Sequence, residues 1–179
     1  FNAETDVLCT TLQQVLTGVS LSGPAVRWDG DERTERSIPE EGAVWVPSLR
    51  DIARPEELDW VGNLSLPSYI HRFSTANSFI MAAFGMTPTY MTKHRVGLST
   101  FEFQLTFHDQ AKPGDMIDIE SCIAELGSSS MRFCHRMRNV ETGSNIASLS
   151  QFGVQLDLDG RRPTRIANDL RVNAQSLLT

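Results

Sequence analysis

One long helical pattern, running from Ser65 to Phe84, constrains the fold of this chain more than any other feature. Apolar side chains recur along it at intervals of three and four residues, which is typical of a helix with one buried face. Ser65 can cap its start, Pro67 is tolerated in a first turn, and Gly85 favours its end. We expect this helix, the longest with a wide apolar face, to be the central element of the fold. Its apolar residues are Tyr69, Ile70, Phe73, Ala76, Ile80, Ala83 and Phe84.

The chain that follows this helix has the pattern of an antiparallel sheet. In residues 100–107, four apolar side chains alternate strictly with polar ones, which predicts a strand with one buried face. A strand is also expected before the helix, over 44–52, and Pro47 indicates that it lies at an edge or carries a bulge. One buried helix followed by a run of four antiparallel strands predicts an α+β architecture. Turn residues bound the three remaining strands, over 116–126, 131–140 and 146–158.

The first 42 residues differ from the rest of the chain. Helical spacing over 5–16 is followed by a long charged connection, whose acidic stretch at 29–41 we expect to be a solvated loop. We therefore predict an N-terminal extension over 1–42, made of a short helix and an acidic loop. A single folded domain is expected over 43–179, with a tail helix near its end.

Composition and spacing exclude several classes of protein. A net charge of −6 without a basic stripe is unfavourable for nucleic-acid binding. No window approaches the ~20 apolar residues of a membrane span, and the glycine motifs of nucleotide-binding folds are absent. The scattered histidines and cysteines give no support for a metal site, so we expect no cofactor. Three cysteines without a CxxC pair favour a reducing, cytoplasmic location.

A short motif precedes the central helix. Asp59, two further residues and Gly62 stand between the predicted strand and the helix, within the run from Pro55 to Tyr69, and a Gly114-Asp115 turn follows the alternating strand. In this arrangement the chain resembles the hotdog acyl-CoA thioesterases, the group that includes the hydroxybenzoyl-CoA type. The resemblance covers about residues 43–165. It implies a hotdog fold, in which a curved antiparallel sheet wraps a long central helix, and a homo-oligomer, either a dimer or a tetramer.

The resemblance makes Asp59 the general base or nucleophile of thioester hydrolysis and the Leu66 amide an oxyanion donor. The reaction needs a carboxylate that activates water or attacks the carbonyl, together with donors for the developing oxyanion. The first N–H groups of a helix have no intrahelical partner and carry the positive end of the helix dipole. Gly62 would supply a tight turn between the two. The alternative interpretation is that Asp59 only caps a loop.

The motif departs from the family at two positions. Many relatives read Gly-His-x-Asn where this chain has Gly62-Asn63-Leu64-Ser65. Asn63, which we keep among the candidate catalytic residues, and Ser65 can form hydrogen bonds, but neither can act as an imidazole base. The candidate substrate contacts are Ser65, Tyr69, Glu102, Gln104 and Arg162.

The more distant candidates have weaker support. In relatives, the strand that carries Glu102 and Gln104 borders the site across the dimer interface, so either side chain could orient water or substrate. Arg162 belongs to an arginine cluster that could meet the phosphates of coenzyme A, since a guanidinium matches phosphate geometry. Solvent-facing polar side chains explain these residues equally well.

The sequence therefore predicts hydrolysis of an acyl-CoA or acyl-carrier thioester. One rival is a hotdog hydratase or dehydratase, but its D-x-N-P-x-H motif is absent here. Another is a non-catalytic acyl-binding hotdog protein, which the missing family residues at Asn63 and Ser65 keep open. Retention of Asp59 argues against that second rival.

Overall fold

The structure, a computed structural model, describes residues 36–39 and 42–178. The helix expected over 5–16 and most of the acidic stretch at 29–41 lie outside these residues. The boundary predicted between an N-terminal extension and the folded domain stays a prediction. No helix within the described residues has both the length and the apolar character needed to cross a membrane.

The central helix, α2 (Leu66–Ala83), forms where the apolar pattern predicts it. Ser65 is its N-cap residue, and Pro67 occupies the first turn, where its missing N–H costs nothing. Gly85 follows the helix with φ +102°, a left-handed conformation that glycine adopts without strain. Phe73, Ala76 and Ile80 are fully buried, so one face of α2 makes the centre of the core.

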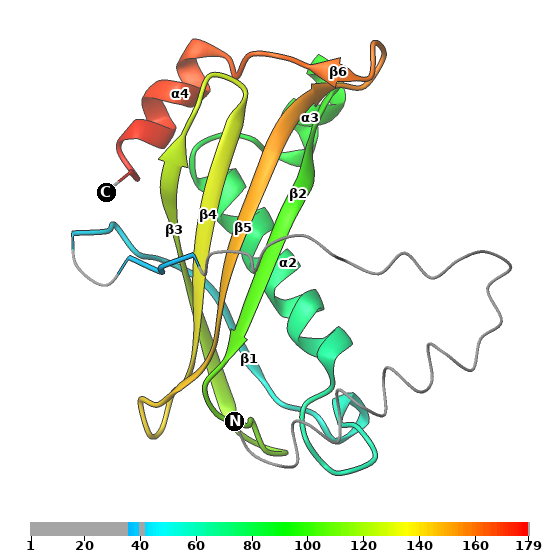
Figure 1. The fold of residues 1–179 in the computed structure, drawn as a ribbon, viewed down its shortest axis with the longest axis vertical. Helices are drawn as coiled ribbons and strands as arrows, with labels where there is room; N and C mark the ends of the chain where they lie inside the picture. The colour runs from blue at the N-terminus through cyan, green and yellow to red at the C-terminus, as the bar shows by residue number, and fades with distance from the viewer. Residues whose placement is uncertain (1–35, 40–41, 179) are drawn as a thin grey trace, which may run out of the picture. The chain divides into compact units, whose positions relative to one another are not determined.

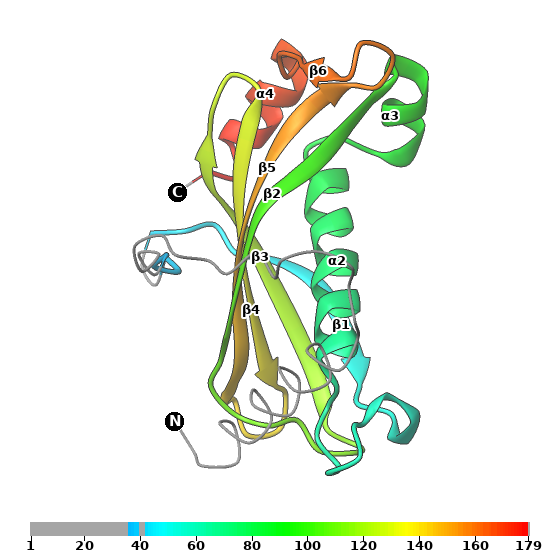
Figure 2. The same cartoon turned by 45° about the vertical axis from the view of Figure 1, so that its right-hand side comes forward.

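The sheet has the order β1-β3-β4-β5-β2, and every neighbouring pair is antiparallel. Figure 1 views this sheet from the side away from α2, and Figure 2 shows the strands curving past the helix, which lies along one face. This is the predicted hotdog arrangement. The strands are β1 (Val46–Ile52), β2 (Val96–Phe107), β3 (Met116–Leu126), β4 (Ser130–Asn139), β5 (Asn145–Asp157) and the short β6 (Arg162–Pro163), which pairs with β5.

The two faces of the sheet differ in character because side chains alternate along each strand. The face toward α2, here called the inner face, carries Phe133 and Met137 of β4, and both are fully buried. The opposite, outer face carries Arg132, Cys134 and Arg136, as the alternation in the sequence predicts.

The prediction for the first strand is also confirmed. β1 lies at one end of the strand order, and its register with β3 shifts between Pro47 and Leu49. A proline has no N–H to donate to a neighbouring strand, so an edge position with a bulge accommodates it.

Three short elements differ from the sequence-based prediction. Helix α3 (Pro88–His94), capped by Thr87, was not predicted, because seven residues without a buried side chain give no apolar period. A single 3-10 turn, η1 (Pro55–Glu57), and the two-residue β6 are too short for any period to reveal. The expected tail helix is present as α4 (Asn168–Gln175).

Candidate active site

The loop between β1 and α2 is organised around the Asp59 carboxylate. Asp59 Oδ1 accepts hydrogen bonds from the amides of Val61 at 2.9 Å and Asn63 at 3.0 Å. The Asp59 amide in turn donates to the Asn63 carbonyl at 2.7 Å, and Gly62 closes the turn with φ +87°. Asp59 Oδ2 has no hydrogen-bond partner among the described residues. One carboxylate oxygen therefore holds the turn, while the other is left for a ligand or water.

The first turn of α2 follows this loop directly. The amides of Ser68 and Tyr69 both donate to the carbonyl of Ser65, which closes the turn. The Ser65 side chain pairs with the Ser68 hydroxyl at 2.9 Å and does not cap the helix. Within the described part of the chain the Leu66 amide has no acceptor, as expected for the first residue of a helix. An unpaired N–H at the positive end of α2 can bind an oxyanion.

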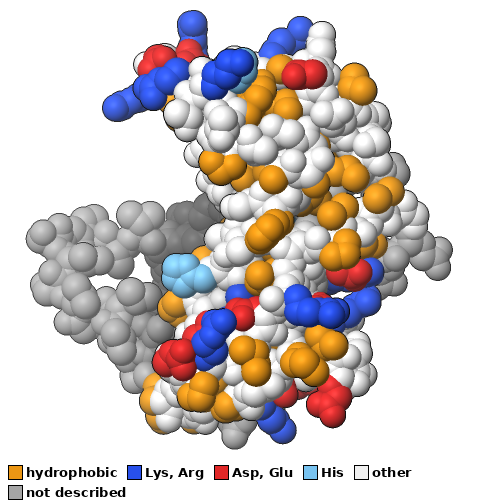
Figure 3. Space-filling model, turned by 180° about the vertical axis from the view of Figure 1, so that it is seen from behind, with side chains coloured by type: hydrophobic (Ala, Val, Ile, Leu, Met, Phe, Trp, Pro, Cys, Tyr) orange, Lys and Arg blue, Asp and Glu red, His pale blue; other side chains and the backbone are white. Residues whose placement is uncertain are grey.

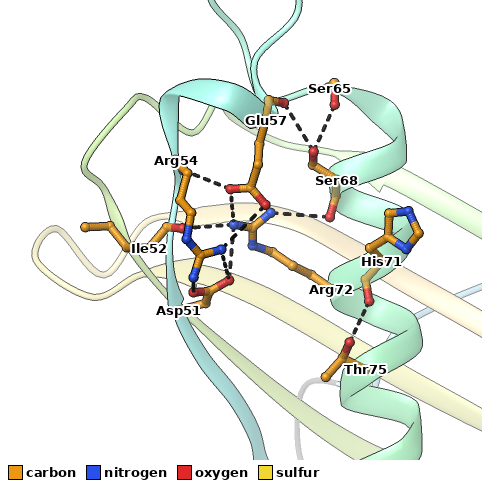
Figure 4. Close-up of polar contacts among 9 residues, drawn as sticks. All are labelled: Asp51, Ile52, Arg54, Glu57, Ser65, Ser68, His71, Arg72 and Thr75. Carbon is orange, nitrogen blue, oxygen red and sulfur yellow. Dashed lines mark hydrogen bonds and ion pairs between the residues drawn. The ribbon is translucent and has the colours of Figure 1, made fainter.

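A buried arginine anchors both ends of this loop. The Arg72 side chain, only 4% exposed, extends from α2 and contacts Glu57 at 2.6 Å and Asp51 at 3.2 Å. It also donates to the carbonyl of Ile52, the last residue of β1, at 2.9 Å. Figure 4 shows these groups converging on one guanidinium from β1, from η1 and from α2. The positions of the strand end and the helix start are thereby fixed relative to each other.

A second arginine completes this network. Arg54 Nη2 contacts Asp51 Oδ1 at 2.8 Å, and the Arg54 amide donates to the Glu57 carboxylate at 2.8 Å (Figure 4). Burial alone would raise the pKa of Glu57. The hydrogen bonds from Arg72 and the Arg54 amide outweigh it and lower the pKa below its ordinary value. The carboxylate is therefore held in its charged form.

Tyr69 connects the start of α2 to the far end of β2. Its side chain is 2% exposed, and its ring meets the Phe107 ring edge-on at 5.0 Å. Burial raises the pKa of Tyr69, and the negative charges of Asp109 and Asp59 add to the rise. The hydroxyl thus stays protonated, in the neighbourhood of Asp59.

The candidate site residues of the loop and of the helix start lie together in the structure. The three other candidates lie elsewhere in the fold. Glu102 is on the outer face of β2, where Arg36 and Arg132 bind its carboxylate at 3.1 and 3.3 Å. The Gln104 side chain accepts from the Arg36 amide at 2.7 Å. Arg162 lies on β6, opposite Asp157 in the backbone register with β5, at the other end of the sheet from the start of α2 (Figure 1). The residues that converge are Asp59, Gly62, Asn63, Ser65, Leu66 and Tyr69.

The Arg72 network was not predicted from the sequence. The available signal was a cation inside an otherwise apolar helix face, one turn after Tyr69. Such a residue needs a carboxylate partner when buried. The sequence offers several acids nearby and does not say which of them meets it.

A metal or cofactor site is not evident in the described ranges. No three side chains of histidine, cysteine, aspartate or glutamate converge there in a way that could hold a metal ion.

Comparison with known proteins places this loop and helix in a family. The model of the thioesterase-like superfamily matches residues 53–173, more than half of the chain. The chain belongs to this superfamily. The match spans the Asp59 loop, α2 and the sheet from β2 to β6, and it confirms the predicted relation to hotdog acyl-CoA thioesterases. Membership of this superfamily supports thioester hydrolysis as the class of reaction.

Solved structures share the fold at low sequence identity. A Staphylococcus aureus protein in complex with CoA matches with TM-score 0.70 and 12% identity, over 77% of this chain and 89% of its own. A 1,4-dihydroxy-2-naphthoyl-CoA thioesterase from Synechocystis matches with TM-score 0.65 and 12% identity, over 72% of this chain and 95% of its own. A DHNA-CoA thioesterase from Staphylococcus aureus matches with TM-score 0.65 and 15% identity, over 72% of this chain and 90% of its own. No curated protein matches the sequence significantly.

The lowered pKa of Glu57 predicts how stability depends on pH. Because the folded-state pKa lies below the ordinary value of 4.5, the ion pair with Arg72 stabilises the fold fully above that value. The contribution is lost as the pH falls through the folded-state pKa. Glu57→Gln should lower the free energy of unfolding at neutral pH, and its difference from the wild type should shrink below pH 4.5. Urea unfolding across this pH range measures both quantities.

Glu56→Gln is the matched control for this experiment. Glu56 is the exposed neighbour of Glu57 and makes no ion pair among the described residues. The buried His135, whose pKa is lowered to about 3 by burial, is common to all three proteins, so its effect cancels in the differences. If Glu57→Gln lowers the free energy of unfolding by the same amount down to the lowest pH, the stabilising role assigned to the Glu57–Arg72 ion pair is contradicted.

Proposed function

We propose that the protein hydrolyses an acyl-CoA or acyl-carrier thioester, with Asp59 as general base or nucleophile and the Leu66 amide as oxyanion donor. The observation that carries the proposal is the arrangement of the loop before α2. Among the described residues, a carboxylate is held there through one oxygen only, in the loop that leads directly into a helix whose first amide has no acceptor. Thioester hydrolysis needs these two kinds of group together.

In the general-base route, Asp59 Oδ2 takes a proton from water, and the water oxygen attacks the carbonyl carbon of the thioester. The carbonyl oxygen becomes an oxyanion, which accepts a hydrogen bond from the Leu66 amide. The carbon–sulfur bond then breaks, and the thiolate takes up a proton to leave a carboxylic acid and a free thiol. In the nucleophilic route, Asp59 attacks the carbon itself, and the carbon–sulfur bond breaks to release the thiolate, which takes up a proton. Water then hydrolyses the mixed anhydride to the carboxylic acid and restores the Asp59 carboxylate.

The residues around Asp59 support our choice of this carboxylate for the proton transfer. Asn63 and Ser65 have no titratable side chain, and Asn63 contributes an amide to the turn. Tyr69 has a raised pKa and stays neutral. Glu57, which lies in the same loop, is engaged by Arg72 and the Arg54 amide, so Asp59 is the carboxylate that we propose for this step.

Coenzyme A is the carrier that the comparisons favour. One structural neighbour is solved in complex with CoA, and two others are named as CoA thioesterases. A phosphopantetheine carrier protein presents the same thioester, so it remains part of the proposal.

We also propose a homodimer formed through β2. This strand ends the sheet, so one side of its backbone has no partner within the described residues. A long unprotected edge favours pairing with another chain. Phe101 on β2 is 64% exposed, and Trp60 beside Asp59 is 78% exposed. Further hydrophobic side chains are spread over the side that carries α2 (Figure 3). Pairing of two β2 edges would cover part of this apolar surface.

Replacement of Asp59 tests the catalytic role. Purified Asp59→Asn should lose about 10²-fold or more in kcat, a loss typical of removing a catalytic base. The assay follows thiol release from a panel of short, long and aromatic acyl-CoAs. Asp159→Asn is the control, since Asp159 pairs with Arg95 on the exposed surface away from this loop. Turnover unchanged in Asp59→Asn would overturn the catalytic role of Asp59. No turnover of any acyl-CoA by the wild type would favour an acyl-binding protein without catalysis or a carrier-protein substrate.

Leu66→Pro tests the oxyanion donor by removing one N–H. Proline is tolerated at the first helical position, and Ser65 before it already has the extended conformation, φ −69° and ψ 151°, that a following proline requires. The kcat should fall by about 10²- to 10³-fold, as for other oxyanion donors. Leu66→Ala keeps the amide and should retain activity. Equal losses in both variants would assign the effect to the side chain.

Phe101→Lys tests the dimer. A lysine on an edge strand opposes pairing of two edges, so sedimentation equilibrium should give a dimer for the wild type and a monomer for the variant. Val172→Lys on α4, where the native side chain is 70% exposed, is the control and should stay dimeric. A monomeric wild type would overturn the proposed assembly.

A further inference from the structure

A hollow lies on the outer face of the sheet, away from the candidate active site. It has a volume of about 610 Å³, and it is bounded by residues 36–39 on one side and by β2, β4 and β5 on the other. In Figure 2 the blue segment that contains residues 36–39 runs on the side of the sheet opposite α2. The hydrogen bonds of Arg36 with Glu102 and Gln104 hold this segment against β2.

The register of the strands builds the polar floor of this hollow. Thr106 of β2 is paired with Ser148 of β5, and Ser148 is paired with Arg136 of β4. Two hydroxyls and a guanidinium therefore stand in one row across three strands. His108 adds a ring nitrogen, Nε2, at 2.9 Å from the Ser148 hydroxyl. Arg138 lies farther along β4 and also borders the hollow.

The charges around the hollow are unbalanced. Among the described residues that line it, three are arginines and none is an aspartate or glutamate. Arg136 and Arg138 share a single carboxylate, Glu120, at 2.7 and 3.7 Å. Arg36 is paired with Glu102 at 3.1 Å. One positive charge therefore remains between Arg136 and Arg138, and each guanidinium has more donors than one carboxylate can engage.

We propose that this hollow binds the phosphate groups of a small organic molecule. Guanidinium groups match phosphate oxygens in geometry and charge, and hydroxyl and imidazole groups add further donors. The volume falls within the roughly 300–1,000 Å³ of small-molecule sites. The ligand is either the nucleotide end of the CoA substrate or a separate phosphorylated metabolite, because both present the same chemistry.

The sheet itself separates this site from the Asp59 loop. Phe107 points to the inner face, where its ring meets Tyr69, while Thr106 belongs to the outer row. The hollow is therefore not an extension of the candidate active site within one chain. Its existence does not depend on the proposed hydrolysis, so the two proposals can fail independently.

Trp45 provides a spectroscopic reporter of ligand binding. The Arg136 guanidinium lies 4.1 Å from the centre of the Trp45 ring, so a ligand that engages Arg136 should change the emission of this tryptophan. The probes are ADP and inorganic pyrophosphate, with adenosine as the control without phosphate. Titration of the wild type should give a saturable change with both phosphate probes and none with adenosine. The change should be absent in Trp45→Phe, while calorimetry should still detect binding to that variant.

The double variant Arg136→Gln/Arg138→Gln should weaken binding of both probes by about tenfold or more, the equivalent of losing one hydrogen bond to a charged group. Lys93→Gln/Arg95→Gln removes the same charge from exposed positions that do not border the hollow and should leave binding unchanged. His108→Glu is a second variant, in which both arginines remain and the added carboxylate should repel the probes. It keeps the proposal testable if the loss of two arginines destabilises the sheet.

The kinetics of the enzyme distinguish the two sources of phosphate. If the ligand is the nucleotide end of CoA, the double variant should raise the KM for acyl-CoA with kcat unchanged, and ADP should compete with CoA. If it is a separate metabolite, the probes should bind with no effect on that KM. Either result supports the site. Absence of binding by both probes, or equal affinity in the wild type, the double variant and His108→Glu, overturns it.

Discussion

The packing of α2 into the curve of the sheet is the interaction on which the rest of the structure depends. Phe73 and Ile80 are completely buried on this helix, and the Phe73 ring lies 5.9 Å from that of His135 on β4. Each such side chain contributes roughly 1.5–3 kcal/mol when removed from water. Because a single helix fills the sheet, the place where it starts is determined by the core. The Leu66 amide, which has no acceptor among the described residues, is consequently presented at one end of the sheet, after the loop that carries Asp59.

This packing requires one polar group to be buried close to the loop. A lone arginine in the core would be very unfavourable, and Arg72 is accommodated because Glu57, Asp51 and a backbone carbonyl surround its guanidinium. Such a cluster adds little net stability compared with apolar packing. Its effect is on position: it connects the end of β1, the turn η1 and the helix, and the loop between them has fixed ends. The catalytic role that we propose for Asp59 would benefit from that constraint, since a small misplacement of a reacting group slows a reaction.

Sequence reasoning succeeded where a regular period was present and failed where contacts join distant residues. The bounds of α2 and β3 were predicted almost to the residue, since 18 and 11 residues give a clear repeat. The seven residues of α3 were too few for a repeat. The position of Asp59 before the helix followed from the motif, whereas its partners in the turn required the fold. The two Arg72 carboxylates also lie 15 and 21 residues away in sequence, and no local pattern selects them.

The motif allows two interpretations of Asp59, as a loop cap and as a catalytic carboxylate. The geometry fits a loop cap, since Oδ1 binds the amides of Val61 and Asn63, yet the second oxygen has no partner among the described residues. In the mechanism that we propose, Oδ1 caps the loop and Oδ2 carries the chemistry, so the two roles belong to different atoms of one side chain. An asparagine keeps an oxygen that can accept both amide hydrogen bonds, so it preserves the turn and removes only the charge. An alanine would remove the cap as well. A difference in activity between the aspartate and asparagine proteins thus reports on the chemistry of the carboxylate, separately from the shape of the loop that it holds.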